Sequence, residues 1–306
     1  MKQKLIFFSI LWSLASVISY SGNAQGCSDA GFCTINSFKP QLAADSAKNW
    51  KSHVKIGGFW GSADNSISVY GNYVEFYRQV SDKIALDAKI TSLGQSGNNI
   101  TVFSISDLFL NLNYRLTSQL QMTVGTKIPF SQANQSSNNL PLPMDYQPSL
   151  GTFDLIFGLG YNFNKLQLVA AIQQPLSQNN NQFLASGYPT NSPLRKFQST
   201  NQYSRKGDVL VRIAYPIVLQ SKLKMTASLL PIYHLGNDQF RDELNRLTDI
   251  QGSKGLTLNG NLFFDYAFNA TNSLQLNLGA PFVVRDVRPD GLTRGFILNL
   301  EYKIKF

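Results

Sequence analysis

The sequence has few charged residues, two cysteines, two histidines and, beyond roughly its first 20 residues, no long apolar run. Charged residues make up 15% of the 306 residues, whereas apolar residues make up 43% and aromatic residues 12%. This apolar content excludes a disordered chain, and the lack of a run of about 18 apolar residues excludes a helical membrane protein. Low charge with abundant Asn, Gln, Ser and Thr favours a β protein with one face in an apolar medium and the other in water.

The N-terminus has the features of a secretory signal peptide. Lys2 and Lys4 form a basic start, and an apolar stretch too short for a membrane anchor runs from Leu5 to Ile18. We predict cleavage after Ala24. The chain then divides into a signal peptide at 1–24, a periplasmic N-terminal segment and candidate plug at 25–50, and an outer-membrane β-barrel at 51–306.

Cys27 and Cys33 lie close together, just after the predicted cleavage site. In an oxidising compartment this arrangement favours a small disulfide loop. The alternative is a lipid attached to Cys27, although Ala24 and Gln25 lack the large aliphatic residue of a lipoprotein signal. Both alternatives stay open. Because there is no other cysteine and the histidines are distant, we expect no metal site, and we expect no cofactor.

Alternating apolar and polar residues recur along the chain, which is typical of strands with one apolar face. The C-terminal stretch is a clear example, with apolar residues at Phe296, Leu298, Leu300, Tyr302, Ile304 and Phe306. Short connections alternate with long ones, as in bacterial barrels, and a soluble sandwich would need more Lys and Glu on its outward face. The sequence therefore predicts a Gram-negative outer-membrane type of transmembrane antiparallel β-barrel with about 12 strands. We place them at 52–61, 66–79, 83–93, 100–116, 119–130, 151–163, 166–176, 206–216, 222–235, 255–268, 273–285 and 294–306.

Aromatic residues precede the short turns, where they would form a girdle at the inner membrane interface. They are Phe76, Tyr114, Tyr161, Phe163, Tyr215, Tyr266, Phe268 and Tyr302. A phenylalanine that ends the last strand resembles the signal read by the barrel-insertion machinery. We therefore expect Tyr302 and Phe306 to face outward as an insertion signal, with that machinery as a partner.

The inward-facing positions carry charges of both signs in near balance. A strongly selective ion channel would show a ring of one sign, so the balance favours ion pairs across the lumen. We predict that the solute path is lined by Arg115, Lys127, Asp154, Arg212 and Asp265. Small neighbours such as Gly158 would leave room for a narrow hydrated path, with each ion pair exposed to water. A purely structural charge network is the alternative.

The segment Gly125–Phe130, followed by Leu150–Leu155 and then Gly158–Tyr161, resembles outer-membrane barrels of the transporter family of the meta-pathway of phenol degradation. The local resemblance covers about residues 120–175 and extends loosely over 52–306. It implies a channel for small, often hydrophobic compounds. The family supplies no catalytic residues, and fold resemblance alone does not name a solute.

Three functions therefore compete. The first is passive or facilitated diffusion of a small solute, with hydrophobic compounds among the candidates. The second is a structural or surface-interaction barrel with a closed lumen, whose loops at 131–150 and 177–205 bind a partner. The third is a barrel enzyme that acts on lipid, which would need a Ser–His pair. His234 has no serine two residues further on, so we expect no enzyme.

Basic residues of the largest predicted external loop suggest lipid partners. Arg195, Lys196, Arg205 and Lys206 suit the phosphates of lipopolysaccharide, alongside contacts with other outer-membrane lipid. The secretory route argues against nucleic acid as a partner.

Overall fold

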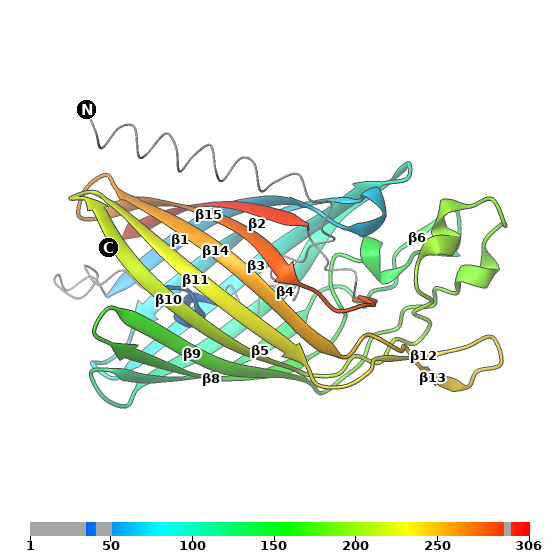
Figure 1. Cartoon of the computed structure of the whole chain (residues 1–306), viewed down its shortest axis with the longest axis horizontal. Coiled ribbons are helices and arrows are strands. Elements are labelled where there is room, and N and C mark those ends of the chain that lie inside the picture. The colour runs from blue at the N-terminus through cyan, green and yellow to red at the C-terminus, as the bar shows by residue number, and fades with distance from the viewer. Residues whose placement is uncertain (1–34, 41–50, 291–294) are drawn as a thin grey trace.

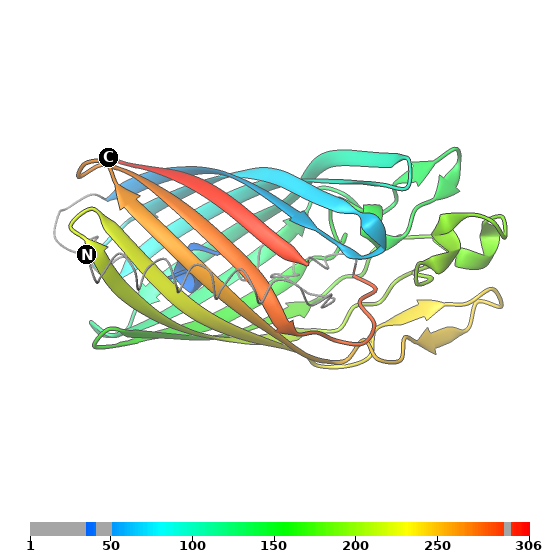
Figure 2. The ribbon, with the colours of Figure 1, turned by 45° about the horizontal axis from the view of Figure 1, so that its top comes forward.

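The computed structural model describes residues 35–40, 51–290 and 295–306. Within this part of the chain, twelve antiparallel strands close into a barrel in which β1 pairs with β16 (Figures 1 and 2). The predicted fold is thereby confirmed. The barrel strands are β1 (Ser52–Ser62), β2 (Ser68–Gln79), β3 (Ile84–Gly97), β4 (Ile100–Arg115), β5 (Leu120–Pro129), β8 (Asp154–Phe163), β9 (Leu166–Pro175), β10 (Asp208–Gln220), β11 (Leu223–His234), β14 (Gly255–Ala267), β15 (Asn272–Val283) and β16 (Phe296–Lys305).

The strands turn a mainly apolar face outward, and many of their inward-facing side chains are polar. On β4, Leu110 and Leu112 are 40% and 41% exposed, whereas Asn111 and Asn113 are both 4% exposed. Alternation along the sequence produces this segregation because successive side chains of a strand point to opposite faces. A closed barrel with an apolar exterior matches the hydrocarbon region of a membrane, where every backbone polar group must be paired internally.

The two ends of the barrel differ in their connections. Short turns and Phe306 lie at one end, whereas the long connections lie at the other (Figures 1 and 2). We call these the periplasmic and external ends. The external connections carry η4 (Asp64–Ser66), β6 (Ser136–Ser137), β7 (Leu140–Pro141), η5 (Met144–Tyr146), η6 (Ala185–Gly187), η7 (Pro193–Lys196), β12 (Gln239–Arg241) and β13 (Leu247–Asp249).

The sheet has an irregularity where β3 meets β4. The register shifts between Ile90 and Ser92, so that Ile90 faces Leu108 while Ser92 faces Ile105. Ile90 and Ile105 are 39% and 51% exposed, which shows that both lie on the outward face. The extra residue lies in β4, because Leu108 and Ile105 are three positions apart and face two positions of β3. Ser92 shares the outward face with Ile90, since alternate side chains of a strand point the same way.

The predicted inner aromatic girdle lies at the periplasmic end. Phe163, Tyr215 and Phe268 are 54%, 47% and 46% exposed on the outward face. The rings of Phe268 and Tyr302 are 6.3 Å apart, and Phe268 also contacts Tyr266 edge-on at 5.1 Å. Such amphipathic rings suit the interface between hydrocarbon and water.

The C-terminal residue closes the seam between β1 and β16. Its backbone N–H donates to the carbonyl oxygen of Ser52 at 3.0 Å, and its carbonyl oxygen accepts from the N–H of Ser52 at 3.1 Å. The Phe306 side chain is 56% exposed, and that of Tyr302 is 37% exposed. Their outward direction agrees with the expected insertion signal, whose recognition stays a prediction.

Deletion of Phe306 is expected to lower the amount of folded barrel in the outer membrane by about tenfold, because it removes both seam hydrogen bonds, each worth about 1 kcal/mol, together with the outward aromatic ring. The measurement is the heat-modifiable gel mobility of the protein in membrane fractions. Phe306→Tyr, which keeps the ring and the backbone, is the control. Wild-type amounts of the deletion variant would contradict this role.

Candidate functional site

Two of the predicted path residues form a deeply buried ion pair. Lys127 on β5 and Asp154 on β8 are 2.8 Å apart, and both side chains are 0% exposed. The lysine also donates to Thr152 at 2.9 Å, and Asp154 accepts from Gln173. The expected exposure of this pair to lumen water was wrong. The loop between β5 and β8 turns inward and places Thr152 on the lysine.

The other three predicted residues lie apart from this pair. Arg212 on β10 is 3% exposed and donates to the carbonyl oxygen of Phe38 at 2.5 Å, while its guanidinium lies 5.8 Å from the ring of Phe263. Asp265 on β14 accepts from Gln275 at 2.7 Å. Arg115 ends β4 and is exposed at the periplasmic end. The structure thus pairs Lys127 with Asp154 and gives each of the others different neighbours.

Residues 35–40, which we call the inner segment, lie inside the barrel and include the short helix η2 (Asn36–Phe38). The Phe38 ring occupies the space beside Gly158, where an added Cβ would lie 2.4 Å from it. Gly158 was expected to leave room for water, and that room is filled by this ring. The inner segment packs on one apolar side of the lumen, which we call the apolar wall. It consists of Phe109, Ile156, Val169, Ala171, Leu210, Leu230 and Ile232.

Polar contacts hold the other side of the inner segment. Lys39 forms an ion pair of 2.6 Å with Glu301 on β16, and Lys55 on β1 donates to Asn36 at 2.7 Å. Tyr73 donates to the same Glu301 at 2.7 Å. These groups are all at most 5% exposed, so water screens the ion pair weakly. The inner segment is therefore anchored to both walls of the lumen.

A group of neutral polar side chains lines the lumen next to the apolar wall. We call it the amide strip; it consists of Ser228, Asn259, Asn261, Gln275 and Asn277 on β11, β14 and β15. Within the described residues, both polar side-chain atoms of Asn259 lack a hydrogen-bond partner, as do one oxygen on each of the other four. Most buried polar groups in folded proteins are paired. The strip therefore offers donors and acceptors that suit water or a polar part of a solute.

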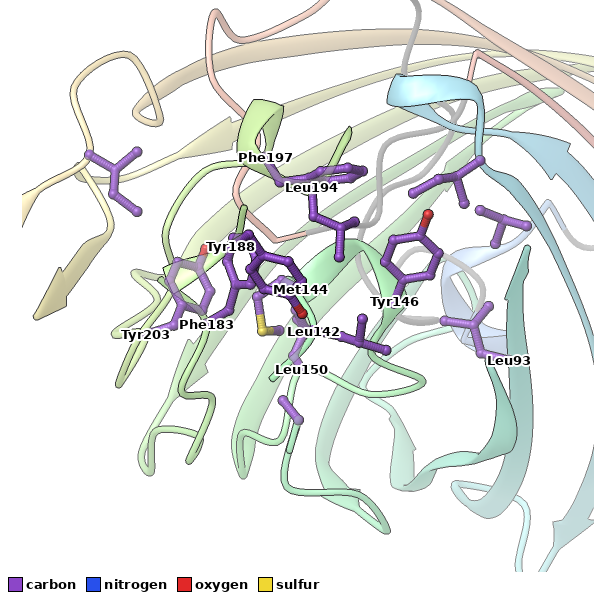
Figure 3. Packing of buried hydrophobic residues seen from close by; sticks show 14 residues of the cluster. Leu93, Leu142, Met144, Tyr146, Leu150, Phe183, Tyr188, Leu194, Phe197 and Tyr203 are labelled. Atoms are coloured by element: carbon purple, nitrogen blue, oxygen red, sulfur yellow. The ribbon is translucent and has the colours of Figure 1, made fainter. Parts of the chain in front are cut away.

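Apolar side chains pack into a cluster at the external end, which we call the external cap (Figure 3). Met144 and Tyr146 come from the connection between β5 and β8, whereas Phe183, Tyr188 and Phe197 come from that between β9 and β10. Tyr146 lies 5.8 Å from Phe197, and Phe183 lies 5.6 Å from Tyr188, measured between ring centroids. The apolar residues of the two long loops are thus packed on one another.

A hydrogen-bonded network ties these loops to the barrel rim. His234, which ends β11, lies 2.7 Å from Asp208 and 2.8 Å from Asp238. Tyr203 donates to Asp238 at 2.7 Å, and burial together with the charge of Asp238 raises the pKa of Tyr203 well above its usual value. Arg205, expected to face lipopolysaccharide, is 1% exposed and pairs with Asp208. That expectation is wrong for Arg205, because its guanidinium is buried in the rim and pairs there with a carboxylate.

Sequence reasoning missed the inner segment contacts and the amide strip. The amide strip could have been predicted from the sequence, because Asn259 and Asn261 occupy alternate, inward positions of a predicted strand. It was missed because only charged residues were considered at the inward positions. Phe38 and Lys39 had no such signal, since they lie outside every alternating stretch. Cys27 and Cys33 lie outside the described residues, as does the predicted signal peptide.

Among the described residues, no helix combines the length and the apolar character needed to span a membrane. Nor do three His, Cys, Asp or Glu side chains come together in this part of the chain as a metal site would require.

The fold and its apolar exterior define the protein as a transmembrane β-barrel of the outer-membrane type. No family model matches the chain, and no curated protein matches it either. Among solved structures, the chain is similar to a NanC porin, with 12% identity, a TM-score of 0.47, and coverage of 83% of this chain and 98% of that one. It is also similar to a KdgM porin, with 7% identity, a TM-score of 0.44, and coverage of 83% of this chain and 99% of that one. A third similar structure is the CymD monoaromatic hydrocarbon channel, with 9% identity, a TM-score of 0.44, and coverage of 93% of this chain and 94% of that one. Identities this low concern the fold alone.

Proposed function

We propose that the protein is an outer-membrane channel through which a small solute crosses by passive or facilitated diffusion. In this proposal, the inner segment and the external cap close the path until they are displaced. The observation that carries the proposal is the amide strip, because a purely structural interior would leave few buried amides without partners. Transient hydrogen bonds along such a strip would let a solute enter without being held tightly.

The two lumen walls suggest the chemistry of the solute. The amide strip lies beside the apolar wall, which Ile35 and Phe38 cover, and β11 contributes residues to both. Displacement of the inner segment would expose a passage with one apolar and one hydrogen-bonding side. An uncharged solute with an apolar body and a hydroxyl or carbonyl group fits such a passage. This agrees with the small, often hydrophobic compounds implied by the resemblance to the meta-pathway transporter family.

The proposal includes the partners and the route expected from the sequence. The chain would be secreted by a cleaved signal peptide and inserted by the barrel-insertion machinery. Outer-membrane lipid and lipopolysaccharide would surround it. Residues 25–50 would form the periplasmic segment, of which residues 35–40 act as the plug.

A structural barrel with a closed lumen is the second candidate function. The external cap favours it, because its buried cluster joins both long loops over the mouth of the barrel. The complete burial of the Lys127–Asp154 pair points the same way. In that case the outer surface of the loops would bind a partner, and no solute would cross.

Vesicles that contain the protein are expected to take up benzyl alcohol and glycerol faster than empty vesicles, as measured by stopped-flow light scattering. Asn259→Leu/Asn261→Leu is expected to lower the protein-dependent rate by about tenfold, because each lost hydrogen bond is worth about 1 kcal/mol. Asn162→Leu, an exposed asparagine near the periplasmic end of β8 and outside the amide strip, is the control. An uptake rate equal to that of empty vesicles would favour the closed barrel, and a double variant at the wild-type rate would remove the strip from the path.

A further inference from the structure

The outward face of the barrel carries a cleft of about 330 Å³ near the external end. It is lined by residues of β1, β2, β4 and β16, among them Gly58, Trp60, Asn72 and Phe103. Trp60 and Phe103 are 51% and 54% exposed on the lipid-facing side. A hollow of this size is at the lower end of the range of small-molecule sites.

A row of aromatic residues forms the external edge of the cleft. Trp60 on β1 pairs with Tyr70 on β2, Tyr70 with Gly94 on β3, and Gly94 with Phe103 on β4. The rings of Tyr70 and Phe103 stack above Gly94, with centroids 6.1 Å apart and planes 10° from parallel. Aromatic side chains at this position of a membrane protein lie at the level of the lipid headgroups.

The next row toward the membrane centre is small and polar. Gly58 pairs with Asn72, and Asn72 pairs with Ser92, which shares the outward face of β3 with Ile90. An added Cβ at Gly58 would meet only a carbonyl oxygen, at 3.6 Å, so space lies open above this glycine. One row deeper, Ile56, Val74 and Ile90 restore the apolar exterior. The cleft is therefore a polar shelf between aromatic rings and hydrocarbon.

In the side-chain amide of Asn72, the oxygen has a hydrogen-bond partner and the NH2 group has none among the described residues. Ser92 donates its hydroxyl proton to Oδ1 of Asn72 at 2.8 Å. Within the described residues, no acceptor contacts its Nδ2 group, and Asn72 is exposed. An amide donor without an acceptor is costly in an apolar medium, so this geometry calls for an oxygen supplied from outside the barrel.

We propose that this cleft binds one outer-membrane lipid, whose acyl chain lies over Gly58 and whose ester carbonyl oxygen accepts a hydrogen bond from Nδ2 of Asn72. Ester carbonyls lie just below the headgroups, which is the depth of a shelf directly beneath the aromatic row. The chain then contacts Trp60 and continues along the apolar exterior. This site lies outside the lumen and does not depend on the proposed channel activity.

The test uses the fluorescence of Trp60 in a Trp12→Phe/Trp50→Phe background, in vesicles that contain a small fraction of brominated phospholipid. Bromine quenches the indole on contact, so the dependence on lipid fraction gives a relative binding constant. Ester-linked dibromo-phosphatidylcholine is expected to bind about threefold to tenfold more tightly than its ether-linked analogue, which lacks the carbonyl oxygen. Asn72→Leu is expected to remove this preference, and Gly58→Leu, which fills the cleft, is expected to lower the binding of both lipids.

Ala170→Leu, which places the same leucine side chain on the outward face of β9, is expected to leave both constants unchanged. Heat-modifiable gel mobility verifies that each variant is folded. Equal binding of the two lipids to the protein with Asn72 intact would overturn the proposal. So would quenching of Trp60 by neither lipid, which would indicate that a second copy of the chain covers the cleft.

Discussion

Phe38→Ala/Lys39→Ala is expected to raise the conductance of the barrel in planar bilayers by at least about tenfold and to produce discrete steps. Removal of a buried phenylalanine side chain typically costs about 3–5 kcal/mol. Here that energy holds the inner segment against the apolar wall, and Lys39 contributes the ion pair with Glu301. The change therefore shifts the equilibrium toward a displaced inner segment. A shift of about 1.4 kcal/mol is already a tenfold change in population.

Two controls separate this effect from a general loosening of the barrel. Lys39→Arg keeps the positive charge opposite Glu301 and should conduct as the wild type does. Phe76→Ala removes an outward ring of β2 that is 41% exposed, and it should also leave conductance unchanged. If the double variant is folded but shows no increase in conductance, the inner segment is not what closes the lumen. The external cap would then be the remaining barrier.

Lys127→Met is expected to lower the free energy of unfolding by about 3–5 kcal/mol, because Asp154 would stay buried without its cation. Equilibrium unfolding in urea, with the barrel in detergent micelles or vesicles, measures this loss. Asp154→Asn should also destabilise, because Lys127 would then stay buried without its anion. Lys127→Met/Asp154→Asn should recover much of the loss, since no buried charge then remains unpaired.

Arg246→Met provides the matched comparison. Its ion pair with Asp242 is 2.7 Å long, close to the 2.8 Å between Lys127 and Asp154, but the Arg246 side chain is 70% exposed. Its removal should cost at most about 1 kcal/mol, because water screens the pair. Equal losses for Lys127→Met and Arg246→Met would show that the Lys127 site is hydrated after all.

The strands and their faces followed from the sequence because alternation is a local property. The C-terminal stretch from Phe296 to Phe306 shows which side chains meet lipid without reference to any other segment. The first strand was the least clear from sequence, since Gly57 and Gly58 interrupt its pattern. The structure explains both glycines: Gly57 makes room for the ring of Tyr73, and Gly58 forms the floor of the outer cleft.

The charged residues of the lumen show where such reasoning ends. The alternation of side chains along each strand placed Lys127 and Asp154 on the inward face. Alternation does not show which other residues cover an inward side chain. The burial of Lys127 and Asp154 depends on Thr152, which the loop after β5 brings onto the lysine. For Arg212 the partner is a carbonyl oxygen 174 residues away in sequence. Neither contact has a periodic signature.

The amino-acid sequence by itself thus determined a barrel of twelve strands, its membrane-facing side and the outward C-terminal phenylalanine. Only the tertiary structure decided what fills the lumen, how the long loops pack at the external end and which buried polar groups lack partners. The physical reason is that these features depend on contacts such as that between Lys39 and Glu301, which are 262 residues apart. Barrel closure brings such residues together, whereas local patterns in the sequence describe only one strand at a time.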